Sequence, residues 1–450
     1  MNQSYYLLSL GCPKNEVDSE CMSALLKEAG YSFTDDPSSA RYLIVNTCAF
    51  IEPAVEEAIG AILDLAGQKG ENSFLVVAGC LSQRYKEEIF EEFPEVDAIL
   101  GTGEFSRIAD TLRSLADGLG LRSHRPGPPE DVSHLDVVRV PSAPQGTYAY
   151  LKIAEGCSNA CAYCTIPRLR GPQRSRPPQA IIKEARCLAD QGVRELILIA
   201  QDTTRYGHDL PGRPTLASLL KQLSRELPAI ELIRCLYFYA GAVTDELIEE
   251  MAVNPKVAHY IDLPIQHASN AVLERMGRHE TIGEITGKIE QFRRLIPDVI
   301  IRSTVITGFP GEKEEDFQKL LDYVRDIRFD RLGCFVFYPE EGTPAALMAD
   351  QVPRTLASSR ATKIMEVQKG IALEANRKRI GSVTPVLFEG VHARGILFQG
   401  RSYGEAPDID PLIFVAATRD DLAIGSRPAV RIVEARPYEL IGVSVHEHCQ

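Results

Sequence analysis

The chain has 450 residues, of which 44% are hydrophobic and 25% charged, and its formal net charge is −13. This length predicts two to four domains, and no apolar stretch approaches the ~20 residues that a membrane-spanning helix needs. The negative charge argues against broad electrostatic binding to nucleic acid and favours a small substrate or a basic protein partner. The N-terminal residues lack the features of a signal peptide, so we expect a cytoplasmic protein whose eleven cysteines are reduced.

The N-terminal region, residues 1–121, alternates strand and helix patterns. Apolar runs are followed by helical stretches, which we expect near residues 17–30, after Pro53, and at residues 83–93. This order predicts an α/β domain with a doubly wound parallel sheet. Three of the runs, YYLLSLGC, RYLIVNTC and FLVVAGC, end at Cys12, Cys48 and Cys80. Because ligands bind beyond the carboxyl ends of such strands, we expect the three thiols to meet and to hold a metal cluster.

Residues 122–146 are rich in Pro, Ser and charged residues, which predicts a linker. Residues 147–379 then contain six strand-like runs with helical stretches between them and end in a charged helix at residues 360–379. Six βα units predict an incomplete barrel of the TIM type, with its chemistry at the C-terminal ends of the strands.

The first barrel strand leads into the stretch EGCSNACAYC, which contains Cys157, Cys161 and Cys164. Three thiolates this close point at one centre but supply no fourth ligand, so one metal position stays open for chemistry. The paired Cys-x-x-Cys knuckles of a structural zinc site are absent. Three unrelated buried cysteines are the alternative, and the tight spacing argues against it.

Residues 380–450 contain short β-rich runs separated by glycines, which predict a small antiparallel β-barrel of the oligonucleotide-binding kind. From Gly381 to Gln450 there are six Arg and no Lys against nine Asp or Glu. An RNA-binding barrel should carry a basic face, whereas an acidic one suits docking onto a basic protein.

With both cysteine sets in view, the chain resembles the radical S-adenosylmethionine (SAM) methylthiotransferases over nearly its full length. The contexts SLGCPKN, VNTCAF and AGCLSQR match the first cysteine set of that family, and the barrel motif with Tyr163 before its last cysteine matches the second. The resemblance implies a cluster-binding domain, a radical SAM barrel and a C-terminal TRAM domain. It also implies two [4Fe–4S] clusters and SAM as cofactors.

Two branches of this family modify different substrates: a hypermodified adenosine in tRNA, or an aspartate of ribosomal protein S-12. The segments AQDTTRYG (residues 200–207) and RSYGEAPDID (residues 401–410) resemble the ribosomal-protein branch. Pro411 and Lys313 depart from its pattern, and neither is an expected cluster ligand.

The resemblance implies that a methylthio group replaces a hydrogen on the β-carbon of the aspartate. Acid–base catalysis removes such a hydrogen poorly, so a radical cofactor must carry the step. The barrel cluster is expected to cleave SAM to a 5′-deoxyadenosyl radical, and the N-terminal cluster to carry the sulfur that a second SAM methylates. The implied partners are S-12, free or in the small subunit, an electron donor and a sulfur donor. Nucleic acid would be met only incidentally, and we expect a monomer.

Residues beyond the barrel strands are further candidates. Gln201, Asp202 and Gly308 follow the second and fifth strands and are candidate SAM contacts. His267 either lines the barrel mouth or is a core histidine. Four arginines after the cysteine motif either bind carboxylates of SAM and substrate or form a solvated loop; they are Arg168, Arg170, Arg174 and Arg176. The cysteines expected in the core are Cys21, Cys187, Cys235 and Cys334, and Cys449 is expected as a surface thiol.

Two other functions remain open at this point. Methylthiolation of tRNA requires a basic face on the TRAM domain and predicts that the modified adenosine disappears when the gene is lost. A non-catalytic iron–sulfur or zinc protein that senses redox state or binds RNA requires closed four-ligand sites and no reductive cleavage of SAM.

Overall fold

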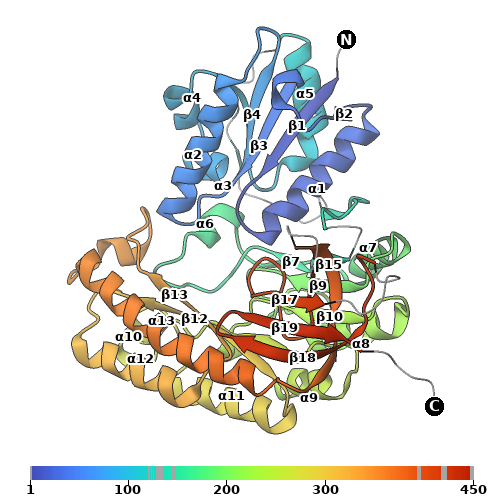
Figure 1. Cartoon of the computed structure of the whole chain (residues 1–450). Coiled ribbons are helices and arrows are strands. Elements are labelled where there is room, and N and C mark those ends of the chain that lie inside the picture. Colours follow the sequence, from blue (N-terminus) through green and yellow to red (C-terminus); the bar gives the residue numbers. More distant parts are fainter. Residues whose placement is uncertain are drawn as a thin grey trace.

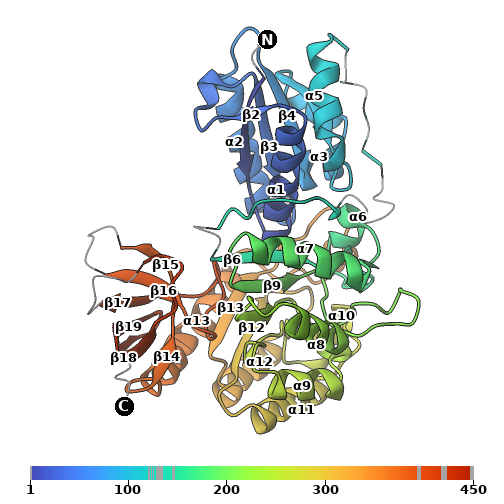
Figure 2. The ribbon, with the colours of Figure 1, turned by 90° about the vertical axis from the view of Figure 1, so that its right-hand side faces the viewer.

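The structure is a computed structural model that describes residues 3–119, 122, 124, 126–127, 135–143, 147–392, 397–416 and 423–445. Three units follow one another along the chain (Figure 1). An N-terminal α/β domain lies above a barrel-like domain, and a C-terminal sheet packs against the side of the barrel, as the turned view in Figure 2 shows.

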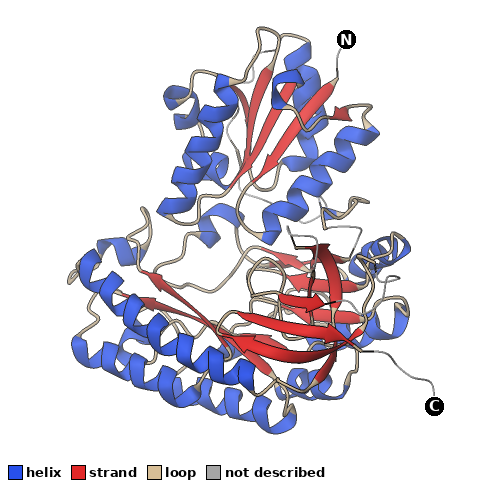
Figure 3. Ribbon diagram, in the orientation of Figure 1, coloured by secondary structure: helices blue, strands red, loops and turns tan. Residues whose placement is uncertain are grey.

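The N-terminal domain is a parallel sheet with the strand order β2-β1-β3-β4-β5 and helices on both faces (Figure 3). Its strands are β1 (Ser4–Ser9), β2 (Ser32–Phe33), β3 (Tyr42–Thr47), β4 (Phe74–Gly79) and β5 (Val96–Leu100). Its helices are α1 (Pro13–Glu28), α2 (Glu52–Gly67), α3 (Cys80–Tyr85), α4 (Glu88–Glu92) and α5 (Ile108–Ala116). The predicted doubly wound sheet is confirmed.

Two of the predicted helices have different bounds. The first begins at Pro13 rather than Val17, because proline suits the first helical turn, where its missing N–H is not needed. The stretch predicted at 83–93 is divided into α3 and α4, since Lys86 adopts a left-handed conformation with φ of +48°. Both α3 and α4 are therefore short.

The central domain is a partial barrel of six parallel strands, as predicted. The strands form two sheets, β10-β9-β6 and β11-β12-β13, which are joined by a parallel bridge between Ile233 and Val257. The strands are β6 (Tyr148–Lys152), β9 (Glu195–Ile199), β10 (Leu232–Cys235), β11 (Tyr260–Asp262), β12 (Ile300–Thr307) and β13 (Arg331–Val336). The helices around them are α7 (Pro178–Asp190), α8 (Leu216–Glu226), α9 (Asp245–Val253), α10 (Asn270–Arg275), α11 (Ile282–Leu295), α12 (Glu314–Ile327) and the exit helix α13 (Arg354–Arg377).

Side chains alternate between the two faces of the barrel strands. On β6, Leu151 packs with the surrounding helices, whereas Tyr150 faces the other way and joins a core that includes residues of the N-terminal domain. The same alternation separates Leu198 from Ile197 on β9. The inner face of the incomplete barrel is therefore covered in part by the N-terminal domain.

The C-terminal domain is a six-stranded sheet with the order β14-β18-β19-β17-β16-β15. Its strands are β14 (Val383–Pro385), β15 (Leu387–Val391), β16 (Phe398–Arg401), β17 (Ile413–Ala416), β18 (Ala429–Arg436) and β19 (Glu439–Ser444). The pairs are antiparallel, as predicted, except that β17 and β19 run parallel. A small apolar core that includes Phe388 and Ile432 fills the sheet's inner side.

Buried charges fix the C-terminal domain to the barrel. Arg401, only 1% exposed, donates from Nη2 to Glu195 Oε2 at 2.9 Å, and Arg234 donates from Nε to Glu195 Oε1 at 2.8 Å. The hydroxyl of Tyr150 donates to Asp408 Oδ2 at 3.0 Å. The segment 401–410, which resembles the ribosomal-protein branch, thus contributes to anchoring the domain.

The described part of the predicted linker is also anchored. Arg139 is 1% exposed and contacts Glu20 of α1, Glu184 of α7 and the backbone carbonyl of Tyr150. A buried arginine with partners in two domains is a bridge rather than a free tether. Among the described residues, no helix combines the length and apolarity needed to cross a membrane.

Candidate active site between two cysteine sets

The barrel cysteines lie on a loop at the C-terminal end of the barrel strands. The loop connects the two-residue strand β7 (Ala154–Glu155) to helix α6 (Ile166–Arg170), and β7 pairs with β8 (Arg174–Ser175). The N–H of Cys157 donates to the carbonyl of Gly171 at 3.0 Å. The predicted position of this motif at the barrel mouth is confirmed by the strands around it.

Close backbone contacts hold the loop. Ala162 donates its N–H to the carbonyl of Met276, which follows α10, at 2.8 Å. Gly156 has φ of +80°, and a Cβ atom there would lie 2.1 Å from the carbonyl oxygen of Pro172. Gly277 has φ of +72°, and its Cβ would lie 2.8 Å from the carbonyl oxygen of Ala160. Only glycine therefore permits this packing on either side of the cysteines.

Asp202 secures the same loop from the end of the second barrel strand. It is 1% exposed, and its Oδ2 accepts a hydrogen bond from Asn159 Nδ2 at 2.8 Å. The N–H of Asn159 in turn points at the sulfur of Cys157 at 3.4 Å. Asp202 Oδ1 also accepts from the hydroxyl of Thr204 at 2.5 Å. The described contacts give Asp202 a positioning role for the cysteine loop.

The N-terminal cysteines lie together at the carboxyl edge of the parallel sheet. Cys12 caps α1, Cys48 follows β3, and Cys80 begins α3 directly after β4. Asn15 Nδ2 ties two of the strand ends together by donating to the carbonyls of Leu10 and Thr47, each at 2.9 Å.

A close backbone approach brings two of these cysteines together. Gly11 has φ of +92°, and a Cβ there would lie 2.6 Å from the Cβ of Cys48. A larger residue before Cys12 would therefore push the two cysteines apart. The predicted meeting of the three strand ends at one edge is confirmed by the sheet topology.

The electrostatic environments of these thiols differ. Burial raises the pKa of Cys48 to about 12, with a further contribution from the neighbouring Cys80 and Cys12. Burial also acts to raise the pKa of Cys12, but the positive charges of Lys14 and Arg170 outweigh it, so that this pKa is lowered. The cationic side chains thus favour a thiolate at Cys12.

Among the residues that the structure describes, no three Cys, His, Asp or Glu side chains come close enough to share one metal ion. In an iron–sulfur cluster each thiolate binds a different iron, so its cysteines need not converge that closely. Three thiols in each set are the ligand type that iron–sulfur clusters use, and binding of a cluster to either set stays a prediction.

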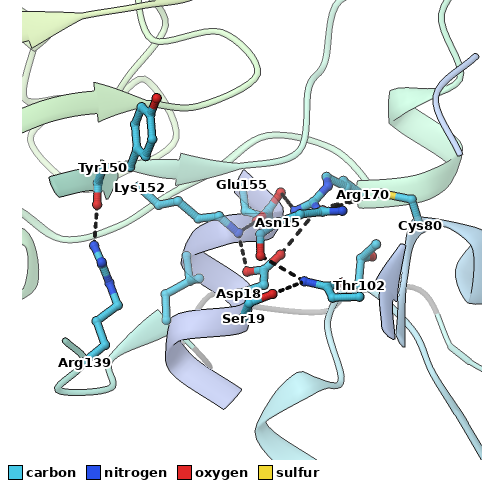
Figure 4. Close-up of polar contacts among 12 residues, drawn as sticks. Asn15, Asp18, Ser19, Cys80, Thr102, Arg139, Tyr150, Lys152, Glu155 and Arg170 are labelled. Atoms are coloured by element: carbon cyan, nitrogen blue, oxygen red, sulfur yellow. Dashed lines mark hydrogen bonds and ion pairs between the residues drawn. The ribbon is translucent and has the colours of Figure 1, made fainter. Parts of the chain in front are cut away.

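A buried polar network spans the interface between the N-terminal and barrel domains beside Cys80 (Figure 4). Lys152 of β6 donates to Asp18 of α1 at 2.5 Å and to Glu155 at 2.8 Å. Arg170 of α6 donates to Glu155 Oε1 at 2.9 Å and to Asn15 Oδ1 at 2.6 Å. All five side chains are buried. The N-terminal and barrel domains thus meet through matched charges beside the cysteines.

Two of the predicted SAM contacts have structural partners. Gln201 Nε2 donates to Glu155 Oε1 at 2.8 Å, while its buried Oε1 has no partner among the described protein atoms. Gly308 has φ of +77°; its N–H donates to Glu312 Oε2 at 2.6 Å, and a Cβ would lie 2.2 Å from the Cβ of Ala357. Packing explains Gly308, and contact with SAM stays a prediction for both residues.

The four arginines after the motif do not form a solvated loop. Arg170 and Arg176 are each 1% exposed, and Arg176 Nη1 pairs with Glu184 Oε2 at 2.5 Å. Arg168 is exposed, whereas Arg174 is half-buried and bonds the carbonyl of Arg170 at 2.8 Å. Two of the four are therefore structural.

His267 is a core residue in this structure. It is completely buried, and its Nδ1 accepts the N–H of Ser269 at 2.9 Å. It does not line the barrel mouth.

The other cysteines fall into two groups. Cys21 and Cys235 are each 1% exposed, so the prediction of a core position is confirmed for both. Cys187 is only partly buried and belongs to no apolar core among the described residues, so the core prediction is wrong for it. Cys334 is also partly buried, but it packs against the large core of the barrel. Cys187 lies on the outer side of α7, where it lines a surface pocket. Cys449 lies outside the described residues.

Apart from Arg170, the network residues were not identified as part of a site in the sequence analysis. The sequence did contain a feature that could have identified two of them, because Lys152 and Glu155 lie in an otherwise apolar strand-like run. A charged side chain in such a run is expected to have a partner, since an unpaired buried charge is costly. Which partner each charge has depends on the contact between domains, and the sequence does not contain that information locally.

Comparisons with known proteins agree with this architecture. The family model described as Uncharacterized protein family UPF0004 matches residues 4–101, that of the Radical SAM superfamily matches residues 151–324, and that of the TRAM domain matches residues 380–445. The solved structure of the radical S-adenosylmethionine methyltransferase TsrM from Kitasatospora setae has a TM-score of 0.55 over 77% of this chain and 74% of that chain. At 14% identity, that likeness concerns the fold alone.

Curated relatives match along almost the whole chain. A protein from Lachnoclostridium phytofermentans named ribosomal protein uS12 methylthiotransferase RimO is 44% identical over 443 residues, which cover 98% of this chain and 99% of the relative. A protein of the same name from Desulforudis audaxviator is 45% identical over 436 residues, with coverages of 96% and 95%. The predicted family membership is confirmed: the chain belongs to the RimO family of radical SAM methylthiotransferases.

Proposed function

We propose that this enzyme attaches a methylthio group to the β-carbon of an aspartate in ribosomal protein uS12. This is the protein called S-12 in the sequence analysis. The observation that carries the proposal is the match of 43–45% identity over nearly full length to relatives named for this activity. The three matched family models and the two cysteine sets, one at the edge of each of two facing domains, support it.

In this proposal Cys157, Cys161 and Cys164 hold a [4Fe–4S] cluster at the barrel mouth. When bound, the cluster with SAM supplies the radical that removes a hydrogen from an unactivated carbon. Asp202 and Asn159 keep the cysteine loop in place through the bond between their side chains at 2.8 Å. The unpartnered Oε1 of Gln201 can accept a hydrogen bond from SAM, because it is buried and has no described protein donor.

Cys12, Cys48 and Cys80 hold the second cluster in this proposal. Lys14 and Arg170 place positive charge beside them and favour the thiolate form that binds iron. The buried network between Lys152, Asp18 and their partners excludes water between the domains. Exclusion of water protects a carbon radical until sulfur reaches it.

A pocket beside Cys12 supports a basic protein substrate. It has a volume of about 420 Å³ and is lined by residues of all three domains, among them Gly11, Glu16, Tyr237 and Asp408. Two carboxyl groups on its wall, those of Glu16 and Asp408, suit lysine or arginine side chains of a basic protein. Because uS12 is the substrate in this proposal, we also place the enzyme in the cytoplasm, as a monomer supplied by separate electron and sulfur donors.

The test is the intact mass of uS12 from cells with and without the gene. We expect the methylthio group to be lost on deletion and restored by the wild type, but not by Cys157→Ala or Cys48→Ala. Cys187→Ala is the matched control, since Cys187 lies outside both sets, and it should restore the modification. An unchanged mass of uS12 after deletion would refute this function, and the methylthio content of tRNA nucleosides would then be measured.

A further inference from the structure

Helix α6 belongs to the barrel sequence but packs in the N-terminal domain. It begins at Ile166, two residues after Cys164, and its Leu169 is part of the apolar core formed by the N-terminal sheet and its helices. The carbonyl of Leu169 accepts the hydroxyl of Thr102 at 2.7 Å. The segment that follows the barrel cysteines is therefore held by the domain that carries the other set.

Arg170, the last residue of α6, reaches the N-terminal cysteines directly. Its Nη2 lies 2.6 Å from Asn15 Oδ1, 3.3 Å from Asp18 Oδ2 and 3.8 Å from Cys80 Sγ. The last distance is within the range of an N–H···S hydrogen bond. Its Nη1 bonds Glu155 on the barrel side at 2.9 Å. The planar guanidinium thus contacts both domains at once.

The backbone beside Arg170 contacts the other cysteine set. The carbonyl of Gly171 accepts the N–H of Cys157 at 3.0 Å. Gly171 has φ of +72°, which redirects the chain immediately after the helix. Two consecutive residues therefore contact one cysteine from each set.

The ion pairs of Arg170 and Lys152 contain equal numbers of positive and negative charges. The two cations Arg170 and Lys152 face the two carboxylates Asp18 and Glu155. Asn15 supplies only an amide oxygen. The guanidinium is therefore paired well enough to stay buried, and its Nη2 also lies within hydrogen-bond distance of the Cys80 sulfur.

We propose that Arg170 is a positioning residue that ties the two cysteine sites together and, through its N–H donated to the sulfur of Cys80, raises the reduction potential of the N-terminal cluster. This inference rests on the proposed function, which places a cluster on Cys12, Cys48 and Cys80. Reduction adds one electron, and hence one negative charge, to the cluster. A hydrogen-bond donor and a positive charge at the ligand sulfur stabilise that charge, because hydrogen bonds to cluster sulfurs help to set such potentials.

The test is an EPR-monitored titration of the full-length protein with dithionite as the one-electron reductant. The barrel cysteines are replaced by alanine so that only the N-terminal cluster is observed, and Arg170→Gln is introduced in that background. We expect the equilibrium constant for reduction to fall about tenfold, which for a one-electron couple is about 59 mV. Arg170→Lys keeps the charge but not the planar fork, and we expect a smaller fall.

Arg168→Gln is the matched control. It removes the same charge from the same helix, but Arg168 lies on the exposed side, where its Nη1 approaches the carbonyl of Glu341 at 3.3 Å. We expect the potential of this variant to stay close to that of the parent protein. A second background, with the N-terminal cysteines replaced instead, reports the barrel cluster, whose potential should change less with Arg170→Gln.

The outcomes separate the two proposals. An unchanged potential in both Arg170 variants, with iron bound to the N-terminal set, would overturn the role of Arg170 and leave the proposed function intact. Absence of iron in the parent protein that keeps only Cys12, Cys48 and Cys80 would overturn the cluster site and the role of Arg170 together. If Arg170→Gln does not fold, the reduction potentials of Arg170→Lys and Arg168→Gln are compared. A lower potential in Arg170→Lys supports the role of Arg170, and equal potentials overturn it.

Discussion

Replacing Glu195 by glutamine should release the C-terminal domain from the barrel. Glu195 lies on β9, is 2% exposed, and accepts bonds from both Arg234 and Arg401, which are themselves buried. Because both arginines hold the pKa of Glu195 below its usual value against the opposing effect of burial, the wild-type residue is ionised at neutral pH. The amide leaves two buried guanidinium groups without this counter-charge.

The expected loss in the free energy of unfolding follows from the partners that each arginine keeps in Glu195→Gln. Arg401 keeps its ion pair with Glu389, whereas Arg234 keeps no carboxylate partner among the described residues, just the carbonyls of Tyr403 and Ser402 and the ring of Tyr260. Removing one partner of a buried ion pair costs about 3–5 kcal/mol. Since Arg401 retains one partner, we expect the lower end, a loss of about 3 kcal/mol in the free energy of unfolding.

The assay combines urea denaturation with limited proteolysis followed by intact mass. Glu195→Gln should expose cleavage sites around the segment 401–410 that the wild type protects, since that segment carries the partners of Arg234 and Glu195. Glu439→Gln is the control, because Glu439 pairs with Arg436 at the surface and such a pair contributes about 0–1 kcal/mol. A loss below 1 kcal/mol in Glu195→Gln, with the C-terminal domain still protected, would show that the buried charges do not anchor it.

Three further results are expected. Gly156→Ala should lower the iron content of the protein to about that of a variant without the barrel cysteines. The reason is that the new Cβ would lie 2.1 Å from a backbone oxygen at a φ of +80°. Full iron occupancy in an iron analysis would contradict this. Burial favours a neutral Glu405, but Arg379 and its neighbours outweigh that effect and lower the pKa to about 2. The ionised form stabilises the fold above the ordinary pKa of 4.5, so urea midpoints should fall between pH 4.5 and pH 2, and less steeply in Glu405→Gln. Leu169→Ala should cost about 2–5 kcal/mol in urea unfolding, as large core truncations do, while Leu347→Ala, 88% exposed, should change stability by less than about 0.5 kcal/mol.

The sequence predicted well the succession of strands and helices in the N-terminal domain and the positions of the cysteines relative to them. Strands that end in Cys12, Cys48 and Cys80 are local patterns, and parallel topology brings their ends to one edge whatever lies around them. The barrel motif was equally local, since its three cysteines share one loop. These parts depend only on strand direction and short spacing.

The contacts between domains were not predictable in this way. The segment around Arg139 has the composition of a linker, yet its arginine is buried between α1 and α7. Likewise, the arginines after the barrel motif read as a basic loop, although Arg170 and Arg176 are buried with carboxylates from distant elements. Asp18 and Lys152 are buried as each other's partners, although more than a hundred residues separate them in the sequence. No local pattern encodes that pairing.

The packing of α6 in the N-terminal domain has a consequence for biosynthesis. The chain emerges from the ribosome from its N-terminus, so the five-stranded sheet is complete once α5 has appeared at Ala116. The helix that brings Leu169 and Arg170 to this domain is made more than fifty residues later. At usual rates of about 5–20 residues per second, that delay lasts several seconds. During this interval the edge with Cys12, Cys48 and Cys80 lacks its later cover, so Cys48 and Cys80 are more accessible than in the finished protein, where both are buried.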